Sequence, residues 1–206
     1  MSDPAWKYPN PRGLLVDLDG TLYSAKPLKL VMGLELLLTG LPKLQKIRAF
    51  RKEHEALRES AEDCAGDPFA RQLQNAAQKL GCSCAELESV VRHWMVDRPC
   101  RWLRFFRNTE LLEELANFRL AGGRCALVSD YPARKKLVAL NALQLFDEVL
   151  ANGEPGGPTH LKPNPAGYLE AARRLGVLAS ECLVIGDRPD ADGLAAERAG
   201  MAYRKV

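Results

Sequence analysis

The sequence predicts an α/β domain, with a parallel sheet covered by helices on both faces, into which an all-helical segment is inserted. Short apolar runs alternate with helical patterns over most of the chain, and several of these runs end directly at polar residues. One long segment in the first half has no strand pattern, which indicates the insert. The 206 residues, 47% hydrophobic and 27% charged, are enough for one domain with a modest insert.

Continuous apolar runs of four or five residues are typical of strands that are buried on both faces of a parallel sheet. The expected strands are residues 13–16 before Asp17, residues 124–128 before Ser129, residues 182–185 before Gly186, and a weaker candidate at residues 146–150. In addition, we expect at most one short strand close to the C-terminus.

Helices are expected between these runs. Residues 111–118 place leucine and phenylalanine on one face, and a Gly-Gly pair at 122–123 ends this helix. Asn164 and Pro165 predict the N-cap and first turn of another helix, which Gly176 ends.

Residues 24–106 break the alternation and form the predicted insert. Apolar residues at helical spacing predict helices over residues 44–57 and 69–80, and a capping box at Ser83–Glu86 begins a third, which continues to Pro99. We therefore expect an α/β core made of residues 1–23 and 107–206, and a helical domain at 24–106.

The most apolar stretch, Leu28–Leu41, is shorter than the ~20 residues of a membrane span. It predicts a buried helix. The alternative is a helix on a membrane surface, helped by the cations that follow it, which are Lys43, Lys46, Arg48 and Arg51.

Composition excludes several classes of partner. The formal charge of +3 gives no reason to expect nucleic acid, and we expect no membrane partner. The six cysteines form no Cys-x-x-Cys pair, so a zinc site is not expected, and Cys125 and Cys182 read as core residues. The N-terminus shows no signal-peptide pattern, so we expect a cytoplasmic protein with free thiols.

Polar groups gather where the strands end, which is where open α/β sheets bind their ligands. Asp17 and Asp19 point the same way on an extended chain, and a hard cation such as Mg²⁺ relieves their repulsion. Asp187 belongs to an acidic cluster, at residues 187–192, that also needs screening. The alternative for both segments is a polar turn.

Two further segments suit a phosphate group. The hydroxyl of Ser129, beside Asp130, and the free N–H groups of a helix start near Pro132 can form a phosphate cradle. Lys162 can act as a point charge on the phosphate. The alternatives are a simple N-cap for Ser129 and an exposed loop lysine for Lys162. His54, His93 and His160 are isolated in the sequence and are given no role.

In their order and spacing, these segments resemble the four motifs of the haloacid dehalogenase-like hydrolase superfamily, in its phosphatase branch. Residues 17–21 (Asp-Leu-Asp-Gly-Thr) resemble the first motif, Ser129 the second, Lys162 the third, and residues 186–192 the fourth. The resemblance implies a Rossmann-like core. It also implies that the insert is a helical cap of the C1 type, as in phosphoglycolate phosphatase-like members.

The resemblance also implies roles for these residues. Asp17 would be the nucleophile that takes the phosphoryl group, and Asp19 the general acid and base. Asp17, the backbone carbonyl of Asp19, and Asp187 would hold Mg²⁺. The remaining groups would be Ser129, Asp130 and Lys162 for binding the phosphoryl group, and Asp192 for supporting Lys162 or a metal-bound water.

The expected function is a Mg²⁺-dependent phosphatase that hydrolyses a small phosphorylated metabolite through an aspartyl-phosphate. A phosphomutase with the same site is the alternative enzyme, and it would release an isomer rather than free phosphate. A catalytically silent interaction protein with the same fold is the alternative outside enzymes. A dehalogenase is disfavoured because Asp19 suits phosphoryl transfer.

Overall fold

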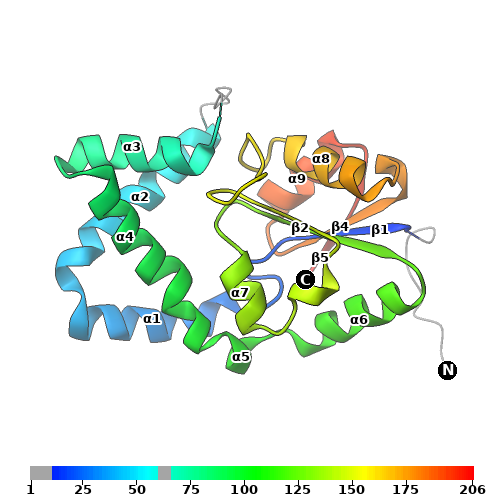
Figure 1. Ribbon diagram of the computed structural model, residues 1–206, viewed down its shortest axis with the longest axis horizontal. Coiled ribbons are helices and arrows are strands. Elements are labelled where there is room, and N and C mark those ends of the chain that lie inside the picture. The colour runs from blue at the N-terminus through cyan, green and yellow to red at the C-terminus, as the bar shows by residue number, and fades with distance from the viewer. Residues whose placement is uncertain (1–10, 60–65) are drawn as a thin grey trace.

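The computed structural model describes residues 11–59 and 66–206. Within these residues, five parallel strands form one sheet in the order β3-β2-β1-β4-β5, so the first strand of the chain lies at its centre (Figure 1). The predicted strands are confirmed, and the short final strand is β5. The strands are β1 (Gly13–Val16), β2 (Arg124–Ser129), β3 (Glu148–Ala151), β4 (Cys182–Gly186) and β5 (Ala202–Lys205).

Helices cover both faces of the sheet, as predicted (Figure 1). Alternate residues of the buried strands point to opposite faces. Leu14 and Leu127 pack towards α6 and α7, whereas Leu15 and Val128 pack towards α8 and α9. The helices of the core are α6 (Thr109–Leu120), α7 (Arg134–Ala139), α8 (Ala166–Leu175) and α9 (Leu194–Arg198), with short helical turns at Leu143–Leu145, Ala179–Glu181 and Pro189–Gly193.

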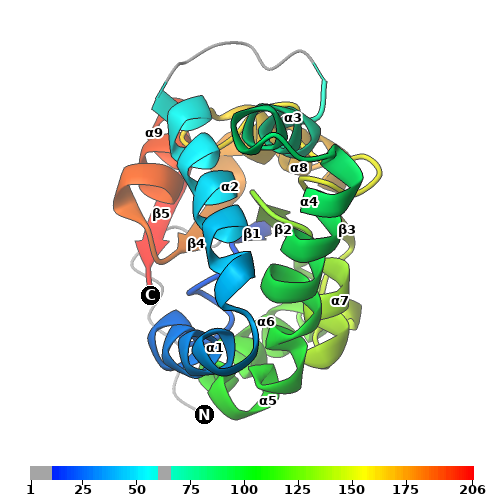
Figure 2. The same cartoon turned by 90° about the vertical axis from the view of Figure 1, so that its left-hand side faces the viewer.

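The segment between β1 and β2 is helical, as predicted, and lies to one side of the sheet (Figures 1 and 2). Phe50 and Phe69 lie in a separate apolar core formed by α2, α3 and α4. The predicted capping box is present, because Ser83 Oγ accepts a hydrogen bond from the Glu86 N–H. The elements are α1 (Ala25–Thr39), α2 (Leu41–Glu59), α3 (Pro68–Leu80), α4 (Cys84–Arg92), a π-helical turn η1 (His93–Asp97), a 3₁₀ turn η2 (Pro99–Arg101) and α5 (Leu103–Phe106).

The expectation that residues 28–41 form a buried helix is wrong. Residues 25–39 do form the helix α1, but of these residues only Leu28 is fully buried. Some of its residues line a cavity and others are exposed. The helix packs mainly against α2 and α5 at the edge of the molecule (Figure 2). Among the residues described, no helix is long and apolar enough to cross a membrane.

The chain passes between the sheet and the helical segment at two adjacent points. Tyr23 and Arg107 form an antiparallel bridge. The Ser24 N–H donates to the Phe106 carbonyl at 2.8 Å, and the Asn108 N–H donates to the Leu22 carbonyl at 2.8 Å. The two crossings predicted from the sequence therefore lie side by side.

Two smaller predictions about local structure also have outcomes. The predicted start of α8 is wrong by one residue, since the N-cap is Pro165 rather than Asn164 and the helix begins at Ala166. Asn164 Oδ1 still accepts from the Ala166 N–H at 2.9 Å. Cys125 and Cys182 are free and buried in β2 and β4, as predicted. Cys64 and the N-terminal segment lie outside the residues that the structure describes.

Candidate active site

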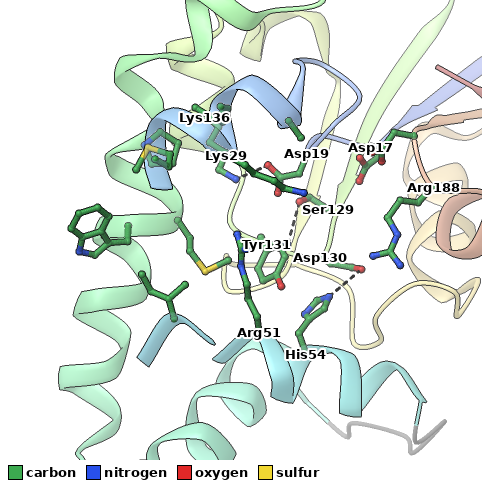
Figure 3. A pocket seen from close by; sticks show the side chains of 18 of the residues that line it. Asp17, Asp19, Lys29, Arg51, His54, Ser129, Asp130, Tyr131, Lys136 and Arg188 are labelled. Carbon is green, nitrogen blue, oxygen red and sulfur yellow. Dashed lines mark hydrogen bonds and ion pairs between the residues drawn. The ribbon is translucent and has the colours of Figure 1, made fainter. Parts of the chain in front are cut away.

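The predicted site residues lie together at the carboxyl ends of β1, β2 and β4, on the floor of a cavity of about 590 Å³. The opposite wall of the cavity comes from α1, α2 and η1 (Figure 3). All seven residues that the sequence analysis assigned to the site line this cavity, and they are Asp17, Asp19, Ser129, Asp130, Lys162, Asp187 and Asp192.

Asp17 leaves β1 at the bottom of the cavity. Its Oδ1 accepts from Lys162 Nζ at 2.5 Å, and its Oδ2 accepts from the Thr21 hydroxyl at 3.0 Å. Burial raises the pKa of Asp17 to about 7, although the charge of Lys162 opposes the shift, and the neighbouring carboxylate of Asp192 adds to it. A proton and a cation therefore compete for this carboxylate near neutral pH.

Lys162 is the buried cation of the site, with 5% of its surface exposed. Its Nζ donates to Asp17, to Asp192 Oδ1 at 2.8 Å, and to the Val128 carbonyl at 3.1 Å, so all three of its donors are used. Burial alone would lower the pKa of Lys162, but Asp17 and Asp192 outweigh it, and the pKa lies well above its ordinary value. Lys162 is therefore charged, and the alternative of an exposed loop lysine is wrong.

Three carboxylates converge beside this lysine. One oxygen each of Asp17, Asp187 and Asp192 lies within 4.8 Å of the others. Burial and the nearby charge of Asp192 raise the pKa of Asp187. Since Lys162 supplies one positive charge against three carboxylates, a divalent cation with hard oxygen ligands suits the donor set.

Gly20 determines how closely Asp187 approaches the loop after β1. Gly20 has a φ of +104°, and a Cβ atom at this position would clash with the carboxylate of Asp187. The turn at Gly20 therefore allows the first and fourth of the predicted segments to meet.

The side chain of Asp19 points away from the carboxylate cluster. Its Oδ1 accepts from Lys136 Nζ at 2.6 Å and from the Tyr23 hydroxyl. Burial raises the pKa of Asp19, but the charge and the hydrogen bond of Lys136, together with the bond from Tyr23, outweigh it, so the pKa lies below its ordinary value. Asp19 is therefore ionised in this structure.

Ser129 is the last residue of β2, which lies next to β1, and Asp130 follows it. The Ser129 hydroxyl accepts from the Tyr131 N–H at 3.2 Å, and Asp130 Oδ1 accepts from the Lys162 N–H at 3.2 Å. Asp130 thus orients the backbone that carries Lys162.

The predicted phosphate cradle at the next helix start is wrong in one respect. The N–H groups of Ala133 and Arg134 are not free, since Glu154 Oε1 accepts from them at 2.8 and 2.9 Å. A carboxylate of this chain thus occupies the helix start that precedes α7, and the hydroxyl of Ser129 is the group of this segment that lines the cavity.

The structure also brings to the site residues that the sequence analysis missed. Lys136 contacts Asp19, and His54 Nε2 from α2 lies 3.8 Å from Asp130 Oδ2 while its ring stacks on Tyr131 (Figure 3). Burial lowers the pKa of His54 despite the opposing charge of Asp130. The sequence around these residues, Arg134-Lys135-Lys136 and Arg51–Glu55, is a charged helix pattern of the kind that usually faces solvent.

The helical segment also reaches the sheet side of the cavity through cations. Arg58 Nε from α2 donates to the Lys162 carbonyl at 2.8 Å, and Arg51 extends from the same helix into the cavity (Figure 3). Arg188, from the loop after β4, lies 3.9 Å from Glu55 of α2. Groups from α2 therefore contact two of the loops that form the site.

The floor of the cavity carries a charged lysine, a hydroxyl, a carboxylate cluster suited to a cation, and a separate ionised carboxylate. Such a set of groups is suited to the hydrolysis of an anionic substrate. The family of haloacid dehalogenase-like hydrolases matches residues 11–200, so the chain belongs to this family of hydrolases.

The individual proteins that resemble this chain either match only part of it or have a low sequence identity. A glyceraldehyde 3-phosphate phosphatase of Methanopyrus kandleri is 39% identical over 100 residues. This match spans 47% of this chain and 42% of that relative. Among solved structures, the HAD-hydrolase YfnB of Bacillus subtilis, bound to magnesium, has a TM-score of 0.64 at 17% identity, covering 96% of this chain and 89% of its own.

The L-2-haloacid dehalogenase of Xanthobacter autotrophicus has a TM-score of 0.64 at 18% identity, and the match covers 95% of this chain and 77% of that chain. At these identities the likeness concerns the fold alone, and it confirms the Rossmann-like α/β architecture predicted from the sequence.

Proposed function

We propose that the protein is a Mg²⁺-dependent phosphatase that hydrolyses a phosphate monoester through an aspartyl-phosphate on Asp17. The observation that carries this proposal is the position of Asp17 at the floor of a cavity, where it contacts a buried lysine and has an oxygen within 4.8 Å of those of two further carboxylates. Membership of the hydrolase family and the partial match to a phosphatase support it.

In the first step Asp17 attacks the phosphorus atom, and the bond between phosphorus and the ester oxygen breaks. Asp19 donates a proton to that leaving oxygen. In the second step a water molecule gives a proton to Asp19 and attacks the phosphoryl group on Asp17, which releases phosphate. The Ser129 hydroxyl and Lys162, whose Nζ would exchange its contact with Asp17 for one with the substrate, bind the phosphoryl oxygens. Charge stabilisation there is the main catalytic contribution.

The two steps need opposite protonation states of Asp19. Lys136 and Tyr23 hold it ionised, which is the form that accepts the proton of the attacking water. We therefore assign to Lys136 the positioning of Asp19 for the second step.

Asp17, Asp187 and the backbone carbonyl of Asp19 would hold Mg²⁺, with Asp192 close enough to bind a metal-bound water or to support Lys162. When bound, the cation supplies positive charge that offsets the phosphoryl oxygens as Asp17 approaches.

We propose that residues 24–106 form a cap domain of the C1 type over the core of residues 1–23 and 107–206. The paired crossings at Ser24 and Asn108 are suited to act as its hinge. Contacts such as that of Arg58 with the Lys162 carbonyl would hold the cap closed and exclude water during the first step.

The direct test is phosphate release from p-nitrophenyl phosphate, measured with Mg²⁺ and with a chelator. Asp17→Asn should abolish the Mg²⁺-dependent release. Asp190→Asn is the matched control, because the Asp190 side chain lies in the same loop as Asp187 and Asp192 but pairs with Arg188 at the surface. A normal rate in Asp17→Asn, or release that is unaffected by the chelator, would contradict the proposal.

A further inference from the structure

The wall of the cavity opposite the carboxylates has a large apolar part, although Lys29, Arg48 and Arg51 of α1 and α2 also line the cavity. The side chains of this apolar part come from α1, α2 and η1, and those that define it are Leu28, Met32, Leu36, Leu44, Ile47 and Trp94. The carboxylates, Lys162 and Ser129 lie at the other end of the cavity, at the strand ends. The cavity therefore has one end suited to a phosphate and another suited to hydrocarbon.

The cavity is larger than a short phosphate ester needs. Its volume of about 590 Å³ is within the range of roughly 300–1,000 Å³ that holds a drug-sized ligand. A phosphate with two or three carbons would fill the polar floor and leave the apolar wall in contact with water. Burial of that wall against hydrocarbon would instead add favourable free energy for each methylene.

One glycine adds to this picture. Gly33 lies on α1 between Met32 and Leu34 and lines the cavity, and a Cβ atom placed there would meet no atom within 4 Å. The helix thus leaves open space at this point of the apolar wall.

We infer that the substrate is an amphiphilic phosphate monoester, in which an extended apolar group is joined to the phosphate. This inference rests on the proposed phosphatase function and names its substrate class. The phosphate lies against Lys162 and Ser129, and the apolar group lies along α1 and α2.

The test is a series of n-alkyl phosphates from two to ten carbons, each below its critical micelle concentration, with phosphate release as the readout. We expect kcat/KM to rise by at least ~10-fold between the two-carbon and eight-carbon esters, since each buried methylene favours binding. Gly33→Leu should remove most of this rise, because it fills the space on the apolar wall, and the two-carbon ester is the reference for each variant. Leu38→Ala, on the outward face of the same helix, is the matched control and should keep the full rise.

The outcomes separate the two proposals. Equal or falling kcat/KM along the series, in a protein that does hydrolyse the short ester, would overturn the substrate class alone. Release from none of the esters and none from p-nitrophenyl phosphate would overturn the phosphatase function itself.

A second observation concerns the outward face of α1. Leu30, Leu34, Leu37 and Leu38 of α1 recur at helical spacing, and with Leu41, the first residue of α2, they are between 55% and 84% exposed. Phe105, on the adjacent α5, is 77% exposed. Contiguous exposed apolar side chains of this kind mark an interaction surface.

The charge around this face identifies the partner it suits. Residues 25–52 contain seven lysines and arginines and one acidic residue, Glu35, which is already paired with Arg98 at 2.7 Å. Three of these cations line the cavity and Lys46 pairs with Glu86, so the exposed cations left beside this face are Lys26, Lys43 and Lys52. An apolar helical face with a basic surround is complementary to an anionic lipid surface. A second copy of the chain would instead bring like charges together.

We propose that the outward face of α1 docks on the surface of a membrane that contains anionic lipid. The sequence analysis expects no membrane partner, but it keeps a membrane-surface helix at Leu28–Leu41 as the alternative. The helix lies on the surface rather than across it, and its opposite face forms the apolar wall of the cavity.

Co-sedimentation with vesicles tests the docking. We expect binding to vesicles that contain phosphatidylglycerol, weaker binding to pure phosphatidylcholine, and a decrease as salt rises. Leu34→Glu/Leu38→Glu should lower the bound fraction by ~10-fold or more. Leu169→Glu/Leu178→Glu, at exposed positions of the core, should not. No binding by the wild type, or a dimer in solution that Leu34→Glu/Leu38→Glu dissociates, would overturn the proposal.

Discussion

Lys136 Nζ lies 2.6 Å from Asp19 Oδ1, although 117 residues separate them in the chain. Lys136 is buried at the start of α7, beside the exposed Lys135. The ion pair explains why Asp19 has a lowered pKa even though burial alone would raise it. The protonation state of the proposed acid and base is therefore determined by a residue of another segment.

Lys136→Met should raise the pKa of Asp19. The variant lacks the positive charge that lowers this pKa, so the effect of burial, which raises it, is no longer opposed by Lys136. At neutral pH more Asp19 would be protonated, so the attack of water would slow and phosphoenzyme would accumulate. We expect kcat for p-nitrophenyl phosphate to fall ~10-fold or more and its pH optimum to move upward. The pH–rate profile and the acid-trapped fraction measure this effect. Lys135→Met, which loses only a surface pair with Asp97, is the control, and an equal effect in both variants would count against the assignment.

Binding of Mg²⁺ should weaken as pH falls through neutrality. Burial raises the pKa of Asp17 to about 7, so its carboxylate is largely protonated at pH 6 and largely ionised at pH 8. Without metal, the free energy of unfolding depends on pH in the opposite direction and decreases as pH rises. The reason is that Asp17 holds its proton more tightly in the folded state than in the unfolded chain. The contribution of Asp17 to stability is therefore lost as pH rises through 7.

Thermal unfolding with and without Mg²⁺ at pH 6 and pH 8 measures both effects. We expect the rise in Tm caused by Mg²⁺ to be larger at pH 8 than at pH 6, and to be absent in Asp187→Asn. A rise that is independent of pH, or one that Asp187→Asn retains, would show that the cation binds elsewhere.

Lys162→Met should reduce stability as well as activity. The substitution leaves Asp17 and Asp192 buried without their cation, and breaking a buried pair in this way costs about 3–5 kcal/mol. Mg²⁺ should restore part of that loss, because it supplies positive charge to the same carboxylates. Chemical unfolding measures the loss, and Lys136→Met should cost less, since Asp19 is only partly buried. Equal losses would mean that the cluster is not held together by Lys162.

Gly20→Ala should weaken Mg²⁺ binding by ~10-fold or more, because the new methyl group displaces the carboxylate of Asp187. Backbone strain at the positive φ adds a cost of about 1–3 kcal/mol to folding. Gly122→Ala separates the two effects, since Gly122 has a φ of +89° but no atom within 4 Å of the new Cβ. Isothermal titration with Mg²⁺ should then show weaker binding in Gly20→Ala and unchanged binding in Gly122→Ala.

Much of the fold was predictable because its signals are local. Buried parallel strands such as Leu14–Val16 are apolar on both faces, and Gly81 and Gly176 end helices in the left-handed conformation that favours glycine. The exposure of α1 was not predictable in this way. An apolar helix reads as buried whether its partner is the rest of the chain or a surface outside it.

The gathering of the candidate residues was predictable mainly at strand ends. Asp17 and Asp187 directly follow β1 and β4, Ser129 ends β2, and the parallel register brings these strand ends to one edge. Lys162 lies well beyond the end of β3, and its assignment came from its place before a helix and from the family resemblance. Lys136 and His54 lie on helices whose charged sequences resemble solvated faces, so only the packing of α7 and α2 shows that these side chains point inward. Glu154 accepts from the N–H groups at the start of α7, and this contact too was not predictable, because Glu154 lies in a loop that is distant in the sequence.

The most direct test of the account is to trap the phosphoryl group on Asp17. Asp19→Asn lacks the base for the second step, but p-nitrophenolate leaves without needing an acid. With Mg²⁺ and p-nitrophenyl phosphate, we expect this variant to release one p-nitrophenolate per molecule in a burst and then stall. Mass spectrometry after acid quench should place the phosphoryl group on Asp17. A folded Asp19→Asn variant that shows no burst, or carries the group elsewhere, while the wild type turns over, would contradict the account.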